Sequence, residues 1–184
     1  MAARLLDVAS PLGKELDSLA DVVTSGVAPG FILWNILGGG CPHDGHSLLA
    51  LPALLIPLFA AYRLAKFNID PRQSHSFLGL PTPANALIWV GLALTPALPL
   101  SNQAFIIGVI AASLVTDVLM VSEMPMFSLK VNFKDMSWRT NSVQYLFLIG
   151  CAVLIAATRQ WYAVSLIILW YIILSAITQK KHAE

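Results

Sequence analysis

Gly13, Asp17 and Asp21 follow one another at intervals of four residues. Four residues are slightly more than one helical turn, so on a helix all three fall on one face, with about 6 Å between successive Cα atoms. Two stacked carboxylates at the entrance to an apolar stretch need a partner. Mg²⁺ and Mn²⁺ favour such hard oxygen ligands, and the glycine one turn earlier leaves room for a bound molecule. The spacing predicts a divalent-metal site, and a solvated acidic helix face is the competing interpretation.

The elements that must position these acids are membrane spans. The chain has 184 residues, of which 57% are hydrophobic and 11% are charged, and its mean hydropathy is +0.73. These values lie far outside the range of soluble domains. Spanning hydrocarbon takes about 20 apolar residues per helix. We therefore predict an all-α, polytopic membrane bundle with six spans, at about 22–40, 48–65, 84–100, 103–122, 143–158 and 161–178.

The basic residues predict how this bundle is oriented. If each run crosses the bilayer, Arg159 lies on one side and the other Lys and Arg residues lie on the opposite side. Such an excess marks the cytoplasmic face, so the Asp17 and Asp21 end should face the cytoplasm. With a net charge of +1 and no interleaved aromatics, these basic residues indicate membrane lipid phosphate as a partner and give no case for nucleic acid.

The residues before the acids carry a family resemblance. Ala3-Arg4, eight residues, Gly13, three residues, Asp17, three residues and Asp21 resemble the second half of the CDP-alcohol phosphatidyltransferase signature, D-x-x-D-G-x-x-A-R-x8-G-x-x-x-D-x-x-x-D. Every spacing in that half is matched. Met1 stands at a position inside the signature, so we expect the D-x-x-D-G segment and its helix to lie upstream of this chain.

The resemblance implies a site and a chemistry. Asp17 would be a metal ligand, and Asp21 a metal ligand and the general base, with Mg or Mn as the cofactor. Ala3, Arg4 and Gly13 would lie against the CDP moiety. Two metals can neutralise a pyrophosphate and its leaving group, while a nearby carboxylate takes the proton of an attacking hydroxyl.

Three later segments, YRLAKFNID, FLGLPTPANA and LMVSEMPMFSLK, are similar in order and type to the serine-transferring members of the same family. The implied domain covers residues 1–142, incomplete at its start, and residues 143–184 form a two-helix carboxy-terminal extension without assigned chemistry. The implied reaction transfers a phosphatidyl group from CDP-diacylglycerol to L-serine, giving phosphatidylserine and CMP. Location in a bacterial inner membrane and a homodimer are further implications.

Several residues near the cytoplasmic end are candidates for binding the acceptor or a lipid phosphate. Arg63 and Lys66 are three apart and suit a phosphate or carboxylate, although they also fit ordinary positive-inside flanking. Asn68 belongs to the same segment. The run Gly79–Pro83 breaks a helix beside the membrane, where irregular backbone is tolerated around a polar cavity. A simple interhelix turn is the alternative.

Asp117 lies inside the fourth apolar run, where a charge costs a few kcal/mol on insertion scales. We expect a structural role, in which Asp117 pairs with a basic residue or stays protonated, and we leave it out of the site. Two other functions stay open for the chain: the same transfer to glycerol 3-phosphate or inositol, and a catalytically inactive membrane scaffold or interaction protein.

Overall fold

The structure is a computed structural model, and it describes residues 10–38, 46–70, 77–96, 98–100, 102–126 and 142–180. Helices account for almost all of these residues, which confirms the all-α prediction. A single pair of two-residue strands is the exception, β1 (Phe77–Leu78) and β2 (Pro125–Met126), which are antiparallel, with Phe77 opposite Met126.

Three helical stretches are long and apolar enough to cross a membrane: Leu12–Ile36, Leu48–Ile69 and Gln103–Val121. The first joins α2 (Pro11–Val22), the π-helical turn η1 (Val23–Val27) and α3 (Ala28–Ile36). The second joins the 3₁₀ segment η2 (His46–Leu54) to α4 (Leu55–Ile69), and the third is α6 (Gln103–Val121). Together with the composition, these stretches define an integral membrane protein.

Three shorter apolar helices match the remaining predicted spans. They are α5 (Thr82–Ala93), α7 (Ser142–Thr158) and α8 (Ala163–Lys180). The helix in the run predicted at 84–100 is shorter than that run, since α5 ends at Ala93, before Pro96. Proline cannot continue a helix without losing a backbone hydrogen bond.

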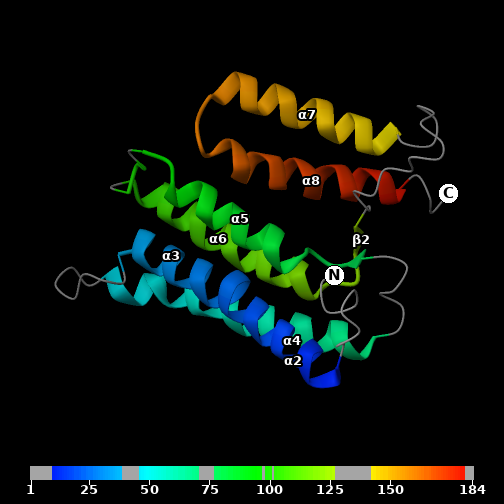
Figure 1. Cartoon of the computed structure of the whole chain (residues 1–184). Helices are drawn as coiled ribbons and strands as arrows, with labels where there is room; N and C mark the ends of the chain where they lie inside the picture. The colour runs from blue at the N-terminus through cyan, green and yellow to red at the C-terminus, as the bar shows by residue number, and fades with distance from the viewer. Residues whose placement is uncertain are drawn as a thin grey trace.

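The helices form three layers (Figure 1). The α7–α8 hairpin lies at the top of the view, α5 and α6 lie in the middle, and α2, α3 and α4 form the bottom layer. The start of α2, the end of α4, the start of α5 and the end of α6 meet at one end of the bundle, beside β1 and β2. We call this the polar end.

Small residues let the first two spans approach closely. A Cβ added at Gly26 would lie 2.9 Å from Ala60 Cβ, and one added at Gly30 would lie 3.0 Å from Pro57 Cδ. The wide turn η1 directly precedes Pro29, whose ring would collide with the carbonyl one turn earlier in a regular helix. The contact fixes the antiparallel register of the first span against α4.

Two apolar clusters form the core, and the α7–α8 hairpin contributes to both. The first includes Leu33, Ile56, Trp89 and Val109, with Ile168 and Ile172 of α8 packed against it. The second is made of Leu80, Met120, Met126, Phe147, Tyr171 and Leu174. The boundary predicted at residue 142 stays a prediction, although the hairpin shares the core of the preceding helices.

Side chains of α5 and α8 also interlock directly. The Ser165 hydroxyl donates a hydrogen bond of 2.6 Å to the Ile88 carbonyl. A Cβ at Gly91 would lie 2.5 Å from Ser165 Oγ, so the two helices touch at this glycine.

Candidate functional site

The acidic stripe lies on α2, at the polar end. Ser10 caps this helix, because its hydroxyl accepts a hydrogen bond of 3.1 Å from the Gly13 N–H, and Pro11 occupies the first turn. The helix continues without interruption to Val22, so Gly13, Asp17 and Asp21 share one face as predicted. Asp17 is exposed and Asp21 is half-buried. Ala3 and Arg4 lie outside the described residues.

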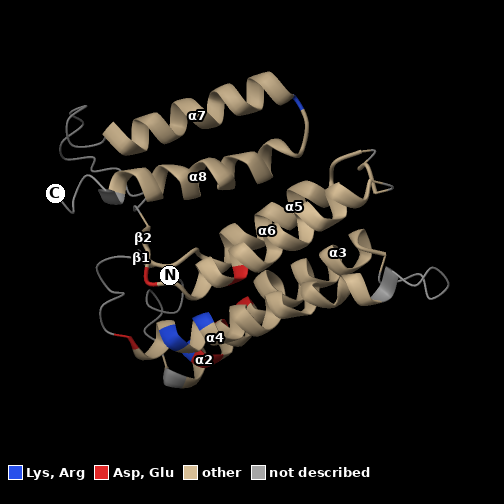
Figure 2. Cartoon of the chain, turned by 180° about the vertical axis from the view of Figure 1, so that it is seen from behind, with Lys and Arg blue, Asp and Glu red and all other residues tan. Residues whose placement is uncertain are grey.

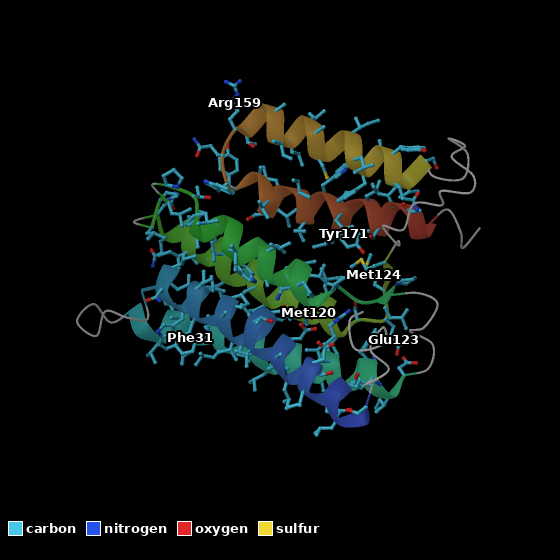
Figure 3. All side chains as sticks on the ribbon, in the orientation of Figure 1. Phe31, Met120, Glu123, Met124, Arg159 and Tyr171 are labelled. Carbon is cyan, nitrogen blue, oxygen red and sulfur yellow. The ribbon has the colours of Figure 1, made fainter. Side chains whose placement is uncertain are left out.

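Charged side chains gather around this stripe. Figure 2 shows lysine, arginine and acidic residues together on α2 and α4 and beside β1 and β2. Arg159, in the turn between α7 and α8, lies at the opposite end of the bundle (Figure 3). The described residues thus have the charge asymmetry that the sequence predicts.

Arg63 is the buried cation of the site. Its side chain leaves α4 with only 7% of its surface exposed, and it interacts electrostatically with Asp21 of α2 and Tyr171 of α8. Its Nε has no hydrogen-bond partner among the described residues. A buried guanidinium with an unused donor is suited to bind an anionic group beside Asp21.

Asn68 ties α4 to the helix that carries the acids. Its amide nitrogen donates to Ser18 Oγ at 2.9 Å and to Glu15 Oε2 at 3.4 Å. Lys14 Nζ donates to the Asn68 backbone carbonyl at 3.2 Å. The Asn68 amide, which was predicted to bind the acceptor or a lipid phosphate, therefore holds α2 in place in this arrangement.

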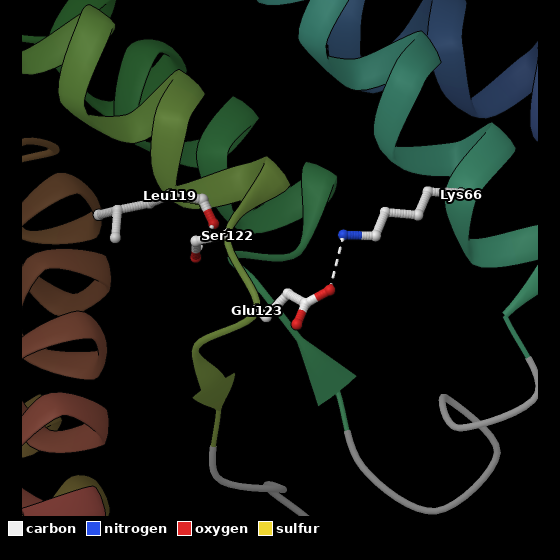
Figure 4. A network of polar contacts seen from close by, with 4 residues as sticks. All are labelled: Lys66, Leu119, Ser122 and Glu123. Atoms are coloured by element: carbon white, nitrogen blue, oxygen red, sulfur yellow. Dashed lines mark hydrogen bonds and ion pairs between the residues drawn. The ribbon is translucent and has the colours of Figure 1, made fainter.

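Lys66 forms an ion pair with a residue beyond the end of α6. Its Nζ lies 3.3 Å from Glu123 Oε1 (Figure 4). Both side chains are open to solvent, so the pair contributes little to stability. Glu123 follows Ser122, whose hydroxyl donates to the Leu119 carbonyl at 2.8 Å and ends the helix. Lys66 is the more exposed of the two candidate phosphate-binding cations.

Backbone hydrogen bonds join the segment before α5 to the end of α6. Gly79 N donates to the Met124 carbonyl at 2.9 Å, and Leu80 N donates to the Leu119 carbonyl at 3.0 Å. Gly79 has a φ of +73°, and an added Cβ would lie 2.6 Å from the Met120 carbonyl oxygen. Only glycine fits this position without strain. The Gly79–Pro83 run is thus a strap that fixes the start of α5 beside α6.

The donor set partly fits a divalent metal. Asp17 and Asp21 offer hard oxygen ligands on one helix face, which suit Mg²⁺ or Mn²⁺. Among the described residues, no group of three or more His, Cys, Asp or Glu side chains converges on one point. The two aspartates would therefore supply part of a ligand set that the substrate, water or other residues complete.

The sequence alone assigned no site role to three further residues of this region. Tyr171 belongs to a helix to which no chemistry was assigned, and Glu123 pairs with Lys66 across two segments. Asp117 is buried on α6 with 1% of its surface exposed. Its position in an apolar run was a visible signal, whereas the roles of Tyr171 and Glu123 depend on contacts between helices distant in sequence.

Comparison with known proteins identifies the family of this integral membrane protein. The family model for CDP-alcohol phosphatidyltransferase matches residues 1–127. The chain belongs to the CDP-alcohol phosphatidyltransferase family, which confirms the resemblance seen in the sequence. No solved structure gives a significant match.

Curated relatives narrow the comparison. The chain is 39% identical over 95 residues to a protein of Bacillus subtilis named CDP-diacylglycerol–serine O-phosphatidyltransferase. The aligned segment covers 52% of this chain and 51% of that relative. Proteins of the same name from Helicobacter pylori (44% over 90 residues; 48% of this chain, 36% of the relative) and Methanocaldococcus jannaschii (40% over 89 residues; 48% and 40%) are similar too. The chain therefore spans about half, or less, of the length of these relatives.

Proposed function

We propose that this protein transfers a phosphatidyl group from CDP-diacylglycerol to L-serine, giving phosphatidylserine and CMP. The observation that carries the proposal is that the family match, residues 1–127, contains the acidic stripe together with the buried Arg63 facing Asp21. The names of the similar proteins support serine as the acceptor. Membrane lipids are the surroundings of the reaction.

Asp21 is the proposed general base. Its half-buried position and its electrostatic interaction with the Arg63 cation distinguish it from the exposed Asp17, and a carboxylate is a group that can accept a proton. The serine hydroxyl loses its proton to Asp21, and its oxygen bonds to the phosphorus that carries diacylglycerol. The bond between that phosphorus and the bridging pyrophosphate oxygen breaks, and CMP leaves with the electron pair.

Asp17 and Asp21 are the proposed ligands of a divalent metal, Mg²⁺ or Mn²⁺. When bound, such a metal neutralises the pyrophosphate and the leaving group. Gly13 carries no side chain, so the helix face beside the acids leaves room for a nucleotide to approach. Ala3 and Arg4 belong to the same proposed CDP-binding segment.

Arg63 and Lys66 are the proposed anion-binding residues for the acceptor or the lipid phosphate. Arg63 is the better placed, because it is buried and interacts with Asp21. Lys66 must leave Glu123 to serve an anion. Asn68 acts through α2, since its amide holds Ser18 one residue from Asp17.

The remaining parts of the proposal concern location and oligomeric state. The excess of basic residues at the polar end supports a site that faces the cytoplasm in a bacterial inner membrane. A homodimer is proposed from family membership alone.

The test is CMP release by membranes that contain the protein, expressed from its gene with any in-frame sequence upstream of Met1. Membranes without the protein are the control, and serine, glycerol 3-phosphate and inositol are offered in turn with CDP-diacylglycerol. Serine-dependent CMP release, lost with EDTA and restored by Mg²⁺ or Mn²⁺, is the expected result. Release only with another acceptor would point to the sister reaction, and no release with any acceptor would favour the inactive scaffold.

A further inference from the structure

A layer of buried polar side chains separates the two apolar clusters of the core. On α6, Ser113, Thr116 and Asp117 lie between Val109 of the first cluster and Met120 of the second. On α5, Asn85 lies between Leu80 of the second cluster and Ile88 of the first. Both helices therefore carry buried polar side chains between the two clusters.

Two side chains of this layer have acceptor oxygens that meet no donor in the described part of the chain. Asp117 is 1% exposed, and neither of its carboxylate oxygens has a hydrogen-bond partner among the described residues. Asn85 is fully buried, and its amide oxygen is also without a partner there. By contrast, Ser113 and Thr116 donate to carbonyls of their own helix, those of Ile110 and Ser113.

Asn85 contacts α6 about one turn from Asp117. Asn85 Nδ2 contacts Met120 Sδ at 3.5 Å, and Met120 follows Asp117 by three residues, nearly one turn along the same buried face of α6. A buried carboxylate is costly without a countercharge and hydrogen bonds. A compact cation that carries several N–H donors would satisfy both groups.

The register of the helices puts this layer next to the proposed reaction site. The helices α4 and α6 both end at the polar end, where Lys66 of α4 pairs with Glu123 just beyond α6 (Figure 1). Arg63 lies six residues before the end of α4 at Ile69, and Asp117 lies four residues before the end of α6 at Val121, so both lie within two helical turns of that end. Figure 3 shows Met120 between the middle and bottom layers of the bundle, on the inner side of Glu123.

We propose that Asp117, together with the amide oxygen of Asn85, binds the α-ammonium group of the amino-acid acceptor. This inference rests on the proposed function. Arg63, with its unused Nε donor, takes the acceptor's carboxylate, and the hydroxyl points to Asp21. Asp117 is thus a specificity-determining residue, which separates amino-acid acceptors from alcohols that lack an ammonium group.

The test measures CMP release at saturating CDP-diacylglycerol for L-serine and for glycerate, in which a hydroxyl replaces the ammonium group. The wild-type protein should prefer serine in kcat/KM by about tenfold or more, because a charge-assisted hydrogen bond is at stake. Asp117→Asn, which keeps the size and removes the charge, should raise the serine KM about tenfold or more and reduce this preference. The KM for CDP-diacylglycerol should stay unchanged.

Thr116→Val is the matched control, because it removes a neighbouring buried hydroxyl of the same layer, which donates to the Ser113 carbonyl within α6. It should leave the serine KM unchanged. Should Asp117→Asn fail to accumulate in membranes, Asp117→Ser removes the charge as well and carries the same expectation.

The outcomes separate the two proposals. A wild-type protein that uses serine and glycerate equally well, or a neutral Asp117 variant with an unaltered serine KM, overturns the inference and leaves the proposed function standing. The latter result would mean that Asp117 is a buried neutral acid. A wild-type protein without serine-dependent CMP release overturns the proposed function and the inference with it.

Discussion

Asp17 and Asp21 are chemically identical but differ in their surroundings, and this difference assigns their proposed roles. Asp17 is exposed on α2, whereas Asp21 is half-buried and interacts with the Arg63 guanidinium. A half-buried carboxylate that interacts with a buried cation has fewer orientations available than an exposed carboxylate. Asp21 is therefore the better placed of the two to accept a proton from a bound hydroxyl.

At this scale we predict the effect of Asp21→Asn. The amide cannot accept the proton of the serine hydroxyl and is a weaker metal ligand, so the rate of CMP release should fall by about 10²–10⁴-fold. The measurement is initial CMP release with CDP-diacylglycerol and serine at saturating Mg²⁺. Glu15→Gln is the control, since it neutralises an exposed carboxylate of the same helix and keeps an oxygen that can accept from Asn68. Unchanged activity in Asp21→Asn would reject the assigned base.

At the scale of elements, hydrogen bonds between segments fix the helices that carry the site. Asn68 holds α4 against α2 through Ser18, and the strap before α5 holds the end of α6 through Gly79 and Leu80. The strap is tight because Gly79 has a positive φ and backbone carbonyls of α6 lie where its Cβ would be. The relative position of Arg63, Asn85 and Asp117 depends on these contacts.

Gly79→Ala should therefore destabilise the protein by about 1–3 kcal/mol, because the added methyl group collides with the Met120 and Ser122 carbonyls and the backbone is strained. Gly108→Ala is the control: it lies in the exposed middle of α6, and its Cβ would meet nothing within 4 Å. It should be neutral or stabilising by up to about 1 kcal/mol. Thermal unfolding midpoints in detergent micelles measure both, and equal midpoints would contradict the tight strap.

At the scale of the whole molecule, the two ends of the bundle differ in their number of basic residues. Lys14, Arg63 and Lys66 belong to the polar end through their interactions with Asn68, Asp21 and Glu123, and Arg159 lies at the other end (Figure 3). The α7–α8 hairpin belongs to the same body, since it shares both apolar clusters and brings Tyr171 toward Arg63. The proposed orientation puts the polar end in the cytoplasm.

Thiol labelling of intact cells tests this orientation. In a variant with Cys41 and Cys151 replaced, a cysteine at Arg159 should react with a membrane-impermeant reagent added outside. A cysteine at Lys14, which is exposed on α2, should react only after the cells are permeabilised. The reverse pattern would overturn the cytoplasmic location of the acidic stripe, and labelling of both without permeabilisation would show that the reagent had entered.

The sequence by itself determined the apolar spans, the shared face of Gly13, Asp17 and Asp21, the charge asymmetry and the family. These are properties of neighbouring residues, because hydrophobic runs and helical periodicity are set within one segment. The short length of α5 also has a local cause, because the helix ends at Ala93, before Pro96.

Only the tertiary structure decided which polar groups meet. Lys66 pairs with Glu123, Arg63 interacts electrostatically with Asp21 and Tyr171, and Asn68 forms hydrogen bonds with α2. Of the two alternatives expected for Asp117, pairing with a basic residue finds no partner among the described residues, and the protonated state stays a prediction. These outcomes depend on the register between helices far apart in the chain, which is set by close contacts such as Gly26 on Ala60 and Gly79 on the end of α6. A pattern within one helix carries no information about that register.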